Sequence, residues 1–310
     1  MTKVLGLVGP TAAGKTELSL GIGERLDAEI VSVDSMQVYR GMDIGTAKPT
    51  PSELARVPHH LIDLYEPSHE ITVAEFQHLA RVEIEQIASR GSVPLLVGGS
   101  GLYFRAVVDR LEFPPRSADL RATLEAEAED VGAETLHARL VELDPAAAAK
   151  IEPGNARRTI RALEAIELTG RPFSENKGWD RYESVFDLTI IGLTRDRPEL
   201  QARIEARVDR MLADGLIEEA RGLRSPSRTA RQALGYRQIL DRPDAPVSEI
   251  RAEIARATRR FARRQESWFR SDPRVTWLDA AREDLEEAAI RHLTAAQASE
   301  GDSEPRPQPR

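Results

Sequence analysis

The chain has 310 residues, of which 41% are hydrophobic and 30% charged, with a net charge of −8 and no cysteine. This composition predicts one large domain, or a core with an inserted piece, and it excludes disulfides and cysteine-based zinc sites. No apolar run reaches the length of a membrane span and the first residues lack a signal peptide's apolar segment, so we expect a soluble, cytoplasmic protein.

A glycine-rich loop near the start of the chain is its clearest motif. After the apolar residues 4–8, the sequence matches G-x-x-x-x-G-K-[ST] at every fixed position, and residues 17–26 have a helical pattern. The N–H groups of such a loop bind phosphate, so we predict a site for a phosphate or a pyrophosphate (diphosphate) at Gly9, Pro10, Thr11, Ala12, Ala13, Gly14, Lys15 and Thr16. Lys15 supplies a point charge, and the Thr16 hydroxyl can reach a magnesium ion. The alternative is an ordinary glycine-containing turn between strand and helix.

An acidic residue follows the next expected strand, residues 28–33. Asp34 stands at the carboxyl end of this strand, where open α/β sheets bind their ligands. It is followed by Ser35, Met36 and Gln37. The alternative role for Asp34 is the N-cap of a helix, a position that aspartate and serine both favour.

The rest of the N-terminal third has the pattern of a parallel sheet. Residues 40–60 are expected to form a functional loop, because they are rich in glycine and proline, and residues 58–63 a short strand. A helix is predicted at 72–90, a buried strand at 93–97 and a further helix from Tyr103. Ser100, in the glycine-rich turn after that strand, should face the same crevice as Lys15 and Asp34. His59 and His60 are not a favoured metal site, because adjacent residues on a strand point to opposite faces.

The middle of the chain has a different character. Residues 113–185 contain helical segments broken by proline and no obvious strand, so we predict a helical insertion domain. Arg157, Arg158 and Arg161 begin one of these helices; both a solvated face and contact with nucleic-acid phosphates remain open for them. A strand at 187–193 restores the core, which therefore comprises 1–112 and 186–298. The polar, proline-rich tail 299–310 is expected to be disordered. The predicted fold class is α/β, with a P-loop NTPase-like parallel sheet flanked by helices.

Two later helices are rich in arginine. The helix predicted at 199–213 places Arg203, Arg207 and Arg210 near one stripe, as in the lids of phosphoryl-transfer enzymes; a solvated face is the alternative for most of them. Val247–Arg270 is predicted as a long helix with a second stripe formed by Arg256, Arg260, Arg263 and Arg264. So basic a face on an acidic protein is typical of nucleic-acid binding. Trp268 and Phe269 either stack on a base or pack in the core.

Together these segments resemble the bacterial tRNA dimethylallyltransferases. The resemblance runs from about residue 4 to 279 and rests on GPTAAGKT at 9–16, DSMQVY at 34–39, GMDIGTAKP at 41–49, PHHLID at 58–63, GGSGLY at 98–103, LGYRQ at 234–238 and RRQESWFR at 263–270. Ser100 replaces the family's usual threonine but keeps the hydroxyl. The zinc-finger extension of eukaryotic relatives is absent.

The resemblance implies transfer of a dimethylallyl group from dimethylallyl diphosphate to N6 of adenosine 37 in the tRNA anticodon loop, with release of pyrophosphate. Asp34 would act as general base. The loop at 9–16, Lys15, Thr16 with Mg²⁺ as cofactor, Arg207 and Ser100 would stabilise the departing pyrophosphate.

The resemblance also implies contacts with the anticodon stem-loop, and we expect the enzyme to be a monomer. The residues implied are Asp34, Ser35, Met36, Gln37, Arg157, Arg158, Arg161, Gln232, Gly235, Tyr236, Arg237, Arg263, Arg264, Gln265, Trp268 and Arg270. Two other functions stay open: prenyl transfer to a free adenine nucleotide, and a P-loop kinase or noncatalytic nucleotide-binding protein. The insertion and the basic segment 263–270 favour tRNA over a free nucleotide, and a kinase should consume ATP.

Overall fold

The chain folds into two compact units. In the computed structural model, which describes residues 1–175, 178 and 181–295, Met1–Val108 and the chain from Ser184 onward form the first unit. Asp109–Glu183 form the second, close to the predicted insertion at 113–185. The predicted disordered tail, 299–310, lies outside the described residues.

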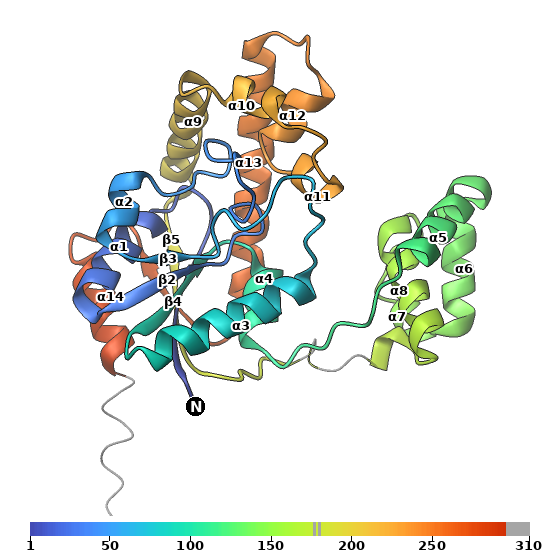
Figure 1. Cartoon of the computed structure of the whole chain (residues 1–310), viewed down its shortest axis with the longest axis horizontal. Helices are drawn as coiled ribbons and strands as arrows, with labels where there is room; N and C mark the ends of the chain where they lie inside the picture. The colour runs from blue at the N-terminus through green and yellow to red at the C-terminus, as the bar shows by residue number, and fades with distance from the viewer. Residues whose placement is uncertain (176–177, 179–180, 296–310) are drawn as a thin grey trace, which may run out of the picture. The chain divides into compact units, whose positions relative to one another are not determined.

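The first unit contains a six-stranded parallel sheet with the strand order β3-β2-β4-β1-β5-β6. This confirms the predicted α/β class (Figure 1). The strands are β1 (Lys3–Val8), β2 (Ala28–Ser32), β3 (His59–His60), β4 (Val93–Gly98), β5 (Asp187–Thr194) and β6 (Val275–Asp279). The edge strand β6 had no counterpart among the predicted elements.

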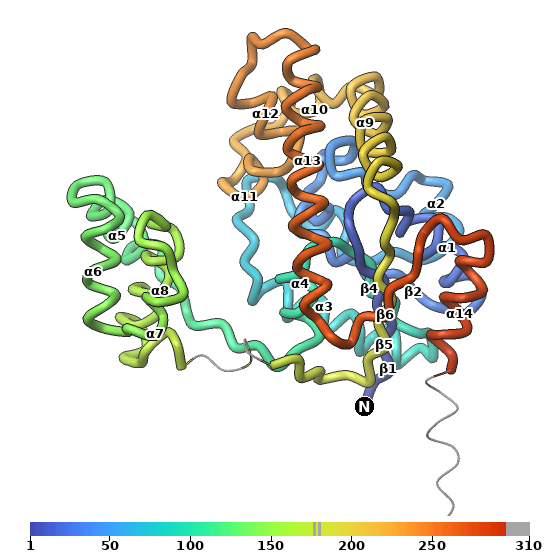
Figure 2. The backbone as a smooth tube through the Cα atoms, turned by 180° about the vertical axis from the view of Figure 1, so that it is seen from behind, coloured from blue at the N-terminus to red at the C-terminus, as the bar shows by residue number. Residues whose placement is uncertain are grey.

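Helices cover both faces of this sheet, and the alternation of side chains along each strand supplies both interfaces. In β1, Val4 and Val8 pack in the larger core cluster, whereas Leu5 and Leu7 pack in the other. The larger cluster includes residues of α3 (Val73–Ser89), α4 (Gly101–Val108) and α13 (Val247–Arg270); the other includes residues of α1 (Lys15–Leu26) and α14 (Leu285–Ala295). Figures 1 and 2 show these two groups of helices on either side of the strands.

Two predictions for residues 40–63 need correction. Residues 40–60 are not all loop, because α2 (Pro51–Arg56) forms there. Thr50 and Glu53 cap it reciprocally, a Thr-x-x-Glu signature that is readable in the sequence. The strand predicted at 58–63 is only His59–His60, since the left-handed backbone of Leu61 (φ 64°) and Asp63 (φ 55°) stops it.

The C-terminal part of the first unit adds a layer of helices beyond the end of the sheet. They are α9 (Arg197–Ala213), α10 (Leu216–Gly222), α11 (Arg228–Arg231) and α12 (Tyr236–Asp241), next to the N-terminal half of α13 (Figure 2). Leu200 and Ile204 of α9 pack with Ala262 of α13, and Ala12 of the glycine-rich loop packs against them. The two arginine-rich helices are therefore joined at this loop.

The described residues of the second unit form helices. Its elements are α5 (Ala118–Val131), α6 (Ala133–Leu143), α7 (Pro145–Ala148), α8 (Ala156–Thr169) and the short 3₁₀ helix η1 (Phe173–Glu175). Leu124, Leu136, Leu140, Ile160 and Leu163 form a core of its own.

The chain leaves and re-enters the first unit at one place. The Val185 N–H donates to the Val108 carbonyl over 2.8 Å, so the two ends of the interrupted core lie side by side. In the described part of the chain, no helix is both long enough and apolar enough to cross a lipid bilayer.

Candidate active site

The glycine-rich loop has the strained backbone that phosphate-binding loops need. Gly9 has φ 140°, and a Cβ atom there would lie 2.7 Å from the Leu193 carbonyl oxygen of β5. Gly14 has φ 113° and precedes the first turn of α1. Only glycine occupies such conformations without strain, so these two positions allow the loop to curl at the end of β1. The phosphate-loop interpretation explains this geometry.

The Lys15 side chain folds back into the glycine-rich loop. Its Nζ donates to the carbonyl oxygens of Gly9 (2.9 Å) and Pro10 (2.8 Å). Burial and the nearby positive charge of Arg207 lower the pKa of Lys15 to about 7, although Asp34 opposes this shift. An anionic ligand would restore the charge of this lysine.

One cavity of about 1570 Å³ opens at the carboxyl end of the sheet, beside the loop. Its lining includes all the residues that the sequence predicts as catalytic: Lys15, Thr16, Asp34, Ser100 and Arg207. They come from α1, from the ends of β2 and β4, and from α9, so the fold brings together groups that are far apart in sequence.

Asp34 forms a turn rather than a helix cap. Its Oδ1 accepts a hydrogen bond from the Met36 N–H at 2.9 Å, and residues 35–38 form a turn, so the N-cap alternative is wrong. Burial raises the pKa of Asp34 above its ordinary value, against the opposing effects of the Met36 N–H, Lys15 and Arg207. A carboxylate whose pKa is raised in a cleft is a candidate general base.

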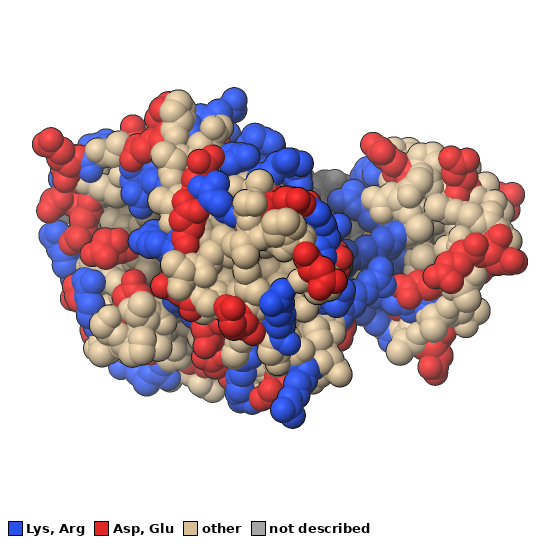
Figure 3. Space-filling model, turned by 90° about the horizontal axis from the view of Figure 1, so that it is seen from above, with Lys and Arg blue, Asp and Glu red and all other residues tan. Residues whose placement is uncertain are grey.

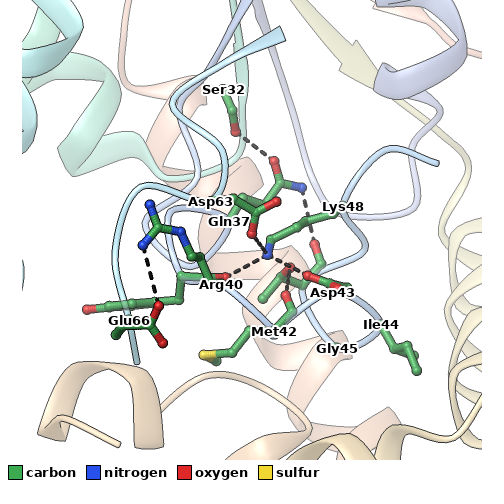
Figure 4. A network of polar contacts seen from close by, with 12 residues as sticks. Ser32, Gln37, Arg40, Met42, Asp43, Ile44, Gly45, Lys48, Asp63 and Glu66 are labelled. Carbon is green, nitrogen blue, oxygen red and sulfur yellow. Dashed lines mark hydrogen bonds and ion pairs between the residues drawn. The ribbon is translucent and has the colours of Figure 1, made fainter. Parts of the chain in front are cut away.

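Gln37 and Lys48 hold the loop that forms one wall of the cavity (Figure 4). Gln37 Nε2 donates to the carbonyls of Thr46 and Ala47, both at 3.2 Å, and its Oε1 accepts from the Ser32 hydroxyl at 2.7 Å. Lys48 Nζ donates to the Tyr39 carbonyl at 2.6 Å and lies between Asp43 (2.6 Å) and Asp63 (2.5 Å). The Gln37 amide, predicted to contact tRNA, is thus engaged within the protein.

The same loop is held from its other side by Glu219 of α10, which the sequence analysis missed. Its carboxylate accepts from the N–H groups of Asp43 (2.9 Å) and Gly45 (3.1 Å), from the N–H between them, and from the Tyr236 hydroxyl (2.5 Å). Tyr236 is fully buried and its ring packs where a side chain on Gly45 would lie. The prediction that Tyr236 contacts tRNA therefore needs correction, because it is a core residue. Of its neighbours, Gln232, Gly235 and Arg237 do line the cavity.

The arginines of α9 face the glycine-rich loop. Arg203 Nε donates to the Ala12 carbonyl at 2.9 Å, and Arg207 and Arg210 line the cavity. Arg207 is half-buried and interacts electrostatically with Asp34 and Lys15. This geometry favours the lid-like interpretation for Arg207 over a solvated face.

The arginine stripe of α13 divides into paired and unpaired members. Arg259 pairs with Glu205 at 3.0 Å, and Arg270 pairs with Glu266 at 2.7 Å and stacks on Trp277. Within the described residues, no ion pair engages the exposed side chains of Arg256, Arg260, Arg263 and Arg264. Figure 3 shows basic side chains interspersed with acidic ones over this end of the core, so the surface here carries charges of both signs.

The two aromatic residues at the end of α13 have different environments. Phe269 is 1% exposed and packs edge-on against Phe104, whereas Trp268 is 40% exposed beside Gly101. Gln265, also predicted to contact tRNA, is buried, and its Oε1 accepts from the Thr11 N–H at 2.9 Å. Only Trp268 of these three is available to stack on a base.

In the insertion unit, Arg157 and Arg158 are exposed at the start of α8, but Arg161 is not a free surface charge. Its guanidinium donates to the carbonyls of Pro114 (2.6 Å) and Pro115 (2.9 Å) and to the buried Glu164 (2.8 Å). Of these three arginines, Arg157 and Arg158 are therefore the ones exposed at the surface. Within this unit, basic side chains gather on one side and acidic ones on the other (Figure 3).

The residues present suit a magnesium ion only together with a ligand. Within the described residues, no three acidic or histidine side chains converge as a metal cage. The exposed Thr16 hydroxyl lies at the first turn of α1 and lines the cavity. Because Mg²⁺ is usually held by one or two protein oxygens together with phosphate and water, this single hydroxyl fits a diphosphate-bound ion.

Comparison with known proteins places the chain in a family. The family model described as IPP transferase matches residues 37–272. The chain therefore belongs to the IPP transferase family. A tRNA dimethylallyltransferase of Streptomyces avermitilis is 51% identical over 291 residues, which is 92% of this chain and 93% of that protein. One from Streptomyces coelicolor is 52% identical over 89% of this chain and 90% of that protein.

The fold is found in solved structures of the same family. The tRNA isopentenylpyrophosphate transferase of Bacillus halodurans superposes with a TM-score of 0.70 at 42% identity, covering 97% of this chain and 100% of that one. These matches confirm the resemblance inferred from the sequence motifs.

Proposed function

We propose that this IPP transferase family member transfers the dimethylallyl group of dimethylallyl diphosphate to N6 of adenosine 37 in the tRNA anticodon loop, releasing pyrophosphate. The observation that carries the proposal is the single cavity that combines a phosphate loop with an aspartate of raised pKa. Family membership and the names of the relatives support the same reaction.

In the proposed reaction, Asp34 takes a proton from the attacking amine. The lone pair of the exocyclic N6 is delocalised into the adenine ring, which makes the amine a weak nucleophile. As the bond from N6 to C1 of the prenyl group forms, the bond from C1 to the bridging diphosphate oxygen breaks, and the N6 proton passes to the Asp34 carboxylate. The Met36 N–H keeps this carboxylate oriented.

The leaving group departs as pyrophosphate, whose negative charge grows as the bond breaks. The loop N–H groups, Lys15, Arg207 and the Ser100 hydroxyl line the space in which it would lie. Fixed donors and charges in a water-poor site stabilise such charge more than they would in water. A magnesium ion bound with the diphosphate would neutralise part of its charge, and Thr16 is the residue that would hold it.

The acceptor is a base that must leave the anticodon loop to enter the cavity. The unpaired arginines of α13 lie at the cavity or close to it in sequence, and would contact RNA phosphates there. Arg157 and Arg158 offer a second contact of this kind. We propose that the protein binds tRNA and transfers the prenyl group as a monomer. Light scattering of the purified protein tests this.

The deciding experiment is mass spectrometry of tRNA nucleosides after incubation with the purified protein, dimethylallyl diphosphate and Mg²⁺, without ATP. We expect N6-dimethylallyladenosine in tRNA. Prenylation of free AMP, ADP or ATP in preference to tRNA would replace this function with nucleotide prenylation. Consumption of ATP with no change in tRNA would indicate a kinase.

A further inference from the structure

Gln265 occupies an unusual position on α13, between the two turns that close the diphosphate side of the cavity. Its side chain is 6% exposed, while Arg263 and Arg264 before it are exposed. It lines the same cavity as Thr11 and Gly99. In the described residues, the fully buried side-chain polar atoms that lack a hydrogen-bond partner belong to Tyr39 and Thr159, so an unpaired atom of the Gln265 amide is one that still reaches the cavity.

The hydrogen bond to the glycine-rich loop fixes which way the amide points. The Thr11 N–H is a donor, so the atom that faces it at 2.9 Å must be Oε1. The Nε2 group, with its two N–H bonds, therefore lies on the opposite side. Among residues 1–175, 178 and 181–295, Nε2 has no hydrogen-bond partner.

The Nε2 group lies against Gly99, in the turn that carries Ser100. A Cβ atom on Gly99 would be 2.1 Å from Nε2 and 3.2 Å from the Gly9 carbonyl oxygen. The space that a side chain at position 99 would fill is thus occupied by the amide, and the two turns approach each other here. Gly99 does not have a left-handed backbone, so the reason for glycine at this position is room rather than conformation.

From this geometry we propose that Gln265 is a further diphosphate-binding residue, whose Nε2 donates to an oxygen of the pyrophosphate leaving group. The inference rests on the proposed function, since it assigns an unpaired donor to the leaving group of that reaction. The Thr11 N–H is used to hold the amide, and the Nε2 group lies beside Gly99, the residue before Ser100. This role differs from the tRNA contact predicted for Gln265 from sequence.

The acceptor of this donor is a diphosphate oxygen rather than an RNA phosphate because of the immediate surroundings. Two neighbours of the amide, Thr11 and Gly99, belong to the turns that would hold the diphosphate in the proposed reaction. The unpaired arginines, which suit RNA phosphates, are exposed, whereas Gln265 is buried. The binding test can separate these two sources of anionic oxygen.

The substitution Gln265→Glu removes the donor and places a negative charge at the same position. The new carboxylate can still accept from the Thr11 N–H, but it has no N–H to offer and repels an anion. We expect the Kd of inorganic pyrophosphate with Mg²⁺, measured by calorimetry, to rise by about tenfold or more, while the Kd of a tRNA anticodon stem-loop changes by less than about twofold. The KM for dimethylallyl diphosphate should rise in parallel.

Gly99→Ala is the second variant, because its methyl group would displace Nε2 while leaving the glutamine in place. It should also weaken pyrophosphate binding and spare tRNA binding, and it keeps the test informative if Gln265→Glu does not fold. Gln86→Glu on the exposed face of α3 adds the same charge elsewhere and should change neither constant.

The contrary results are distinct. Unchanged pyrophosphate affinity in both variants would overturn the proposal and leave Gln265 as an internal tie. Weakened tRNA binding with normal pyrophosphate binding would also overturn it and restore the RNA contact. Neither result bears on whether the wild-type protein prenylates tRNA, so a failure of this inference is distinguishable from a failure of the proposed function.

Discussion

The helices α9 and α13 both carry a row of arginines, and the structure treats the two rows differently. On α9, Arg207 is half-buried beside Asp34 and Lys15, and Arg203 is bonded to the loop carbonyl of Ala12. On α13, the unpaired arginines are exposed to solvent. A partly buried charge acts more strongly on one nearby group than a charge in water does, whereas exposed charges act collectively and are screened by salt. The same residue type therefore suits leaving-group stabilisation on one helix and RNA backbone contact on the other.

The largest effect is expected from removing the Asp34 carboxylate, which interacts electrostatically with Arg207. Asp34→Asn keeps the size of the side chain but removes the proton acceptor, so kcat should fall by about 10³-fold. The affinity for tRNA should stay within a few-fold, as measured by filter binding. Near-normal turnover in this variant would exclude Asp34 as the base.

Arg207→Ala tests the role of the half-buried arginine on α9. Loss of a charge that faces the diphosphate should lower kcat by on the order of 10²-fold, without changing the salt dependence of tRNA binding. Arg197→Ala, at the exposed start of the same helix, is the matched control and should leave kcat unchanged. An equal loss in both variants would mean that position on α9 does not matter.

The pH dependence of the rate tests whether Asp34 is the base. A base works only when it is unprotonated, and burial raises the pKa of Asp34 above its ordinary value of 3.8. The rate is therefore retained above the raised pKa and lost as the pH falls through it, by up to about tenfold per pH unit. Single-turnover rates across this range should show an acid limb above that of an ordinary aspartate. A limb at or below the ordinary value would contradict the assignment.

The smallest expected effect concerns the exposed row. Arg264→Ala should weaken tRNA binding by several-fold and reduce the slope of log K against log salt by about one. Arg251→Ala is the control, because Arg251 of the same helix is already paired with Asp209 at 2.5 Å. If both variants lower the slope equally, the distinction between paired and unpaired arginines carries no information about RNA binding.

Local patterns in the sequence were enough for most of the fold. The bounds of α13 agree with the predicted Val247–Arg270, because its apolar spacing continues without interruption. Strands buried on both faces, such as β4, were evident as apolar runs. The edge strand β6 was missed, since it is short and mostly only partly buried.

The site was predictable where a motif fixes the chemistry, and less so where function depends on distant contacts. Lys15 and Asp34 follow strands at recognisable places. Glu219 looks like one more acid on a polar helix, and only the fold brings it to the loop at 43–45. Tyr236 and Arg161 show the converse. The sequence predicted that they contact RNA, but in the folded chain the Tyr236 hydroxyl donates to Glu219 and the Arg161 guanidinium donates to the Pro114 carbonyl.

The backbone contact between Val185 and Val108, where the helical unit leaves and rejoins the core, bears on how such an enzyme can change over evolutionary time. Because the helical unit departs and returns at neighbouring residues outside the sheet, the paired strands would be retained if that unit were exchanged for another. An exchange of this kind would leave the lining of the cavity in place, because all of its residues belong to the first unit.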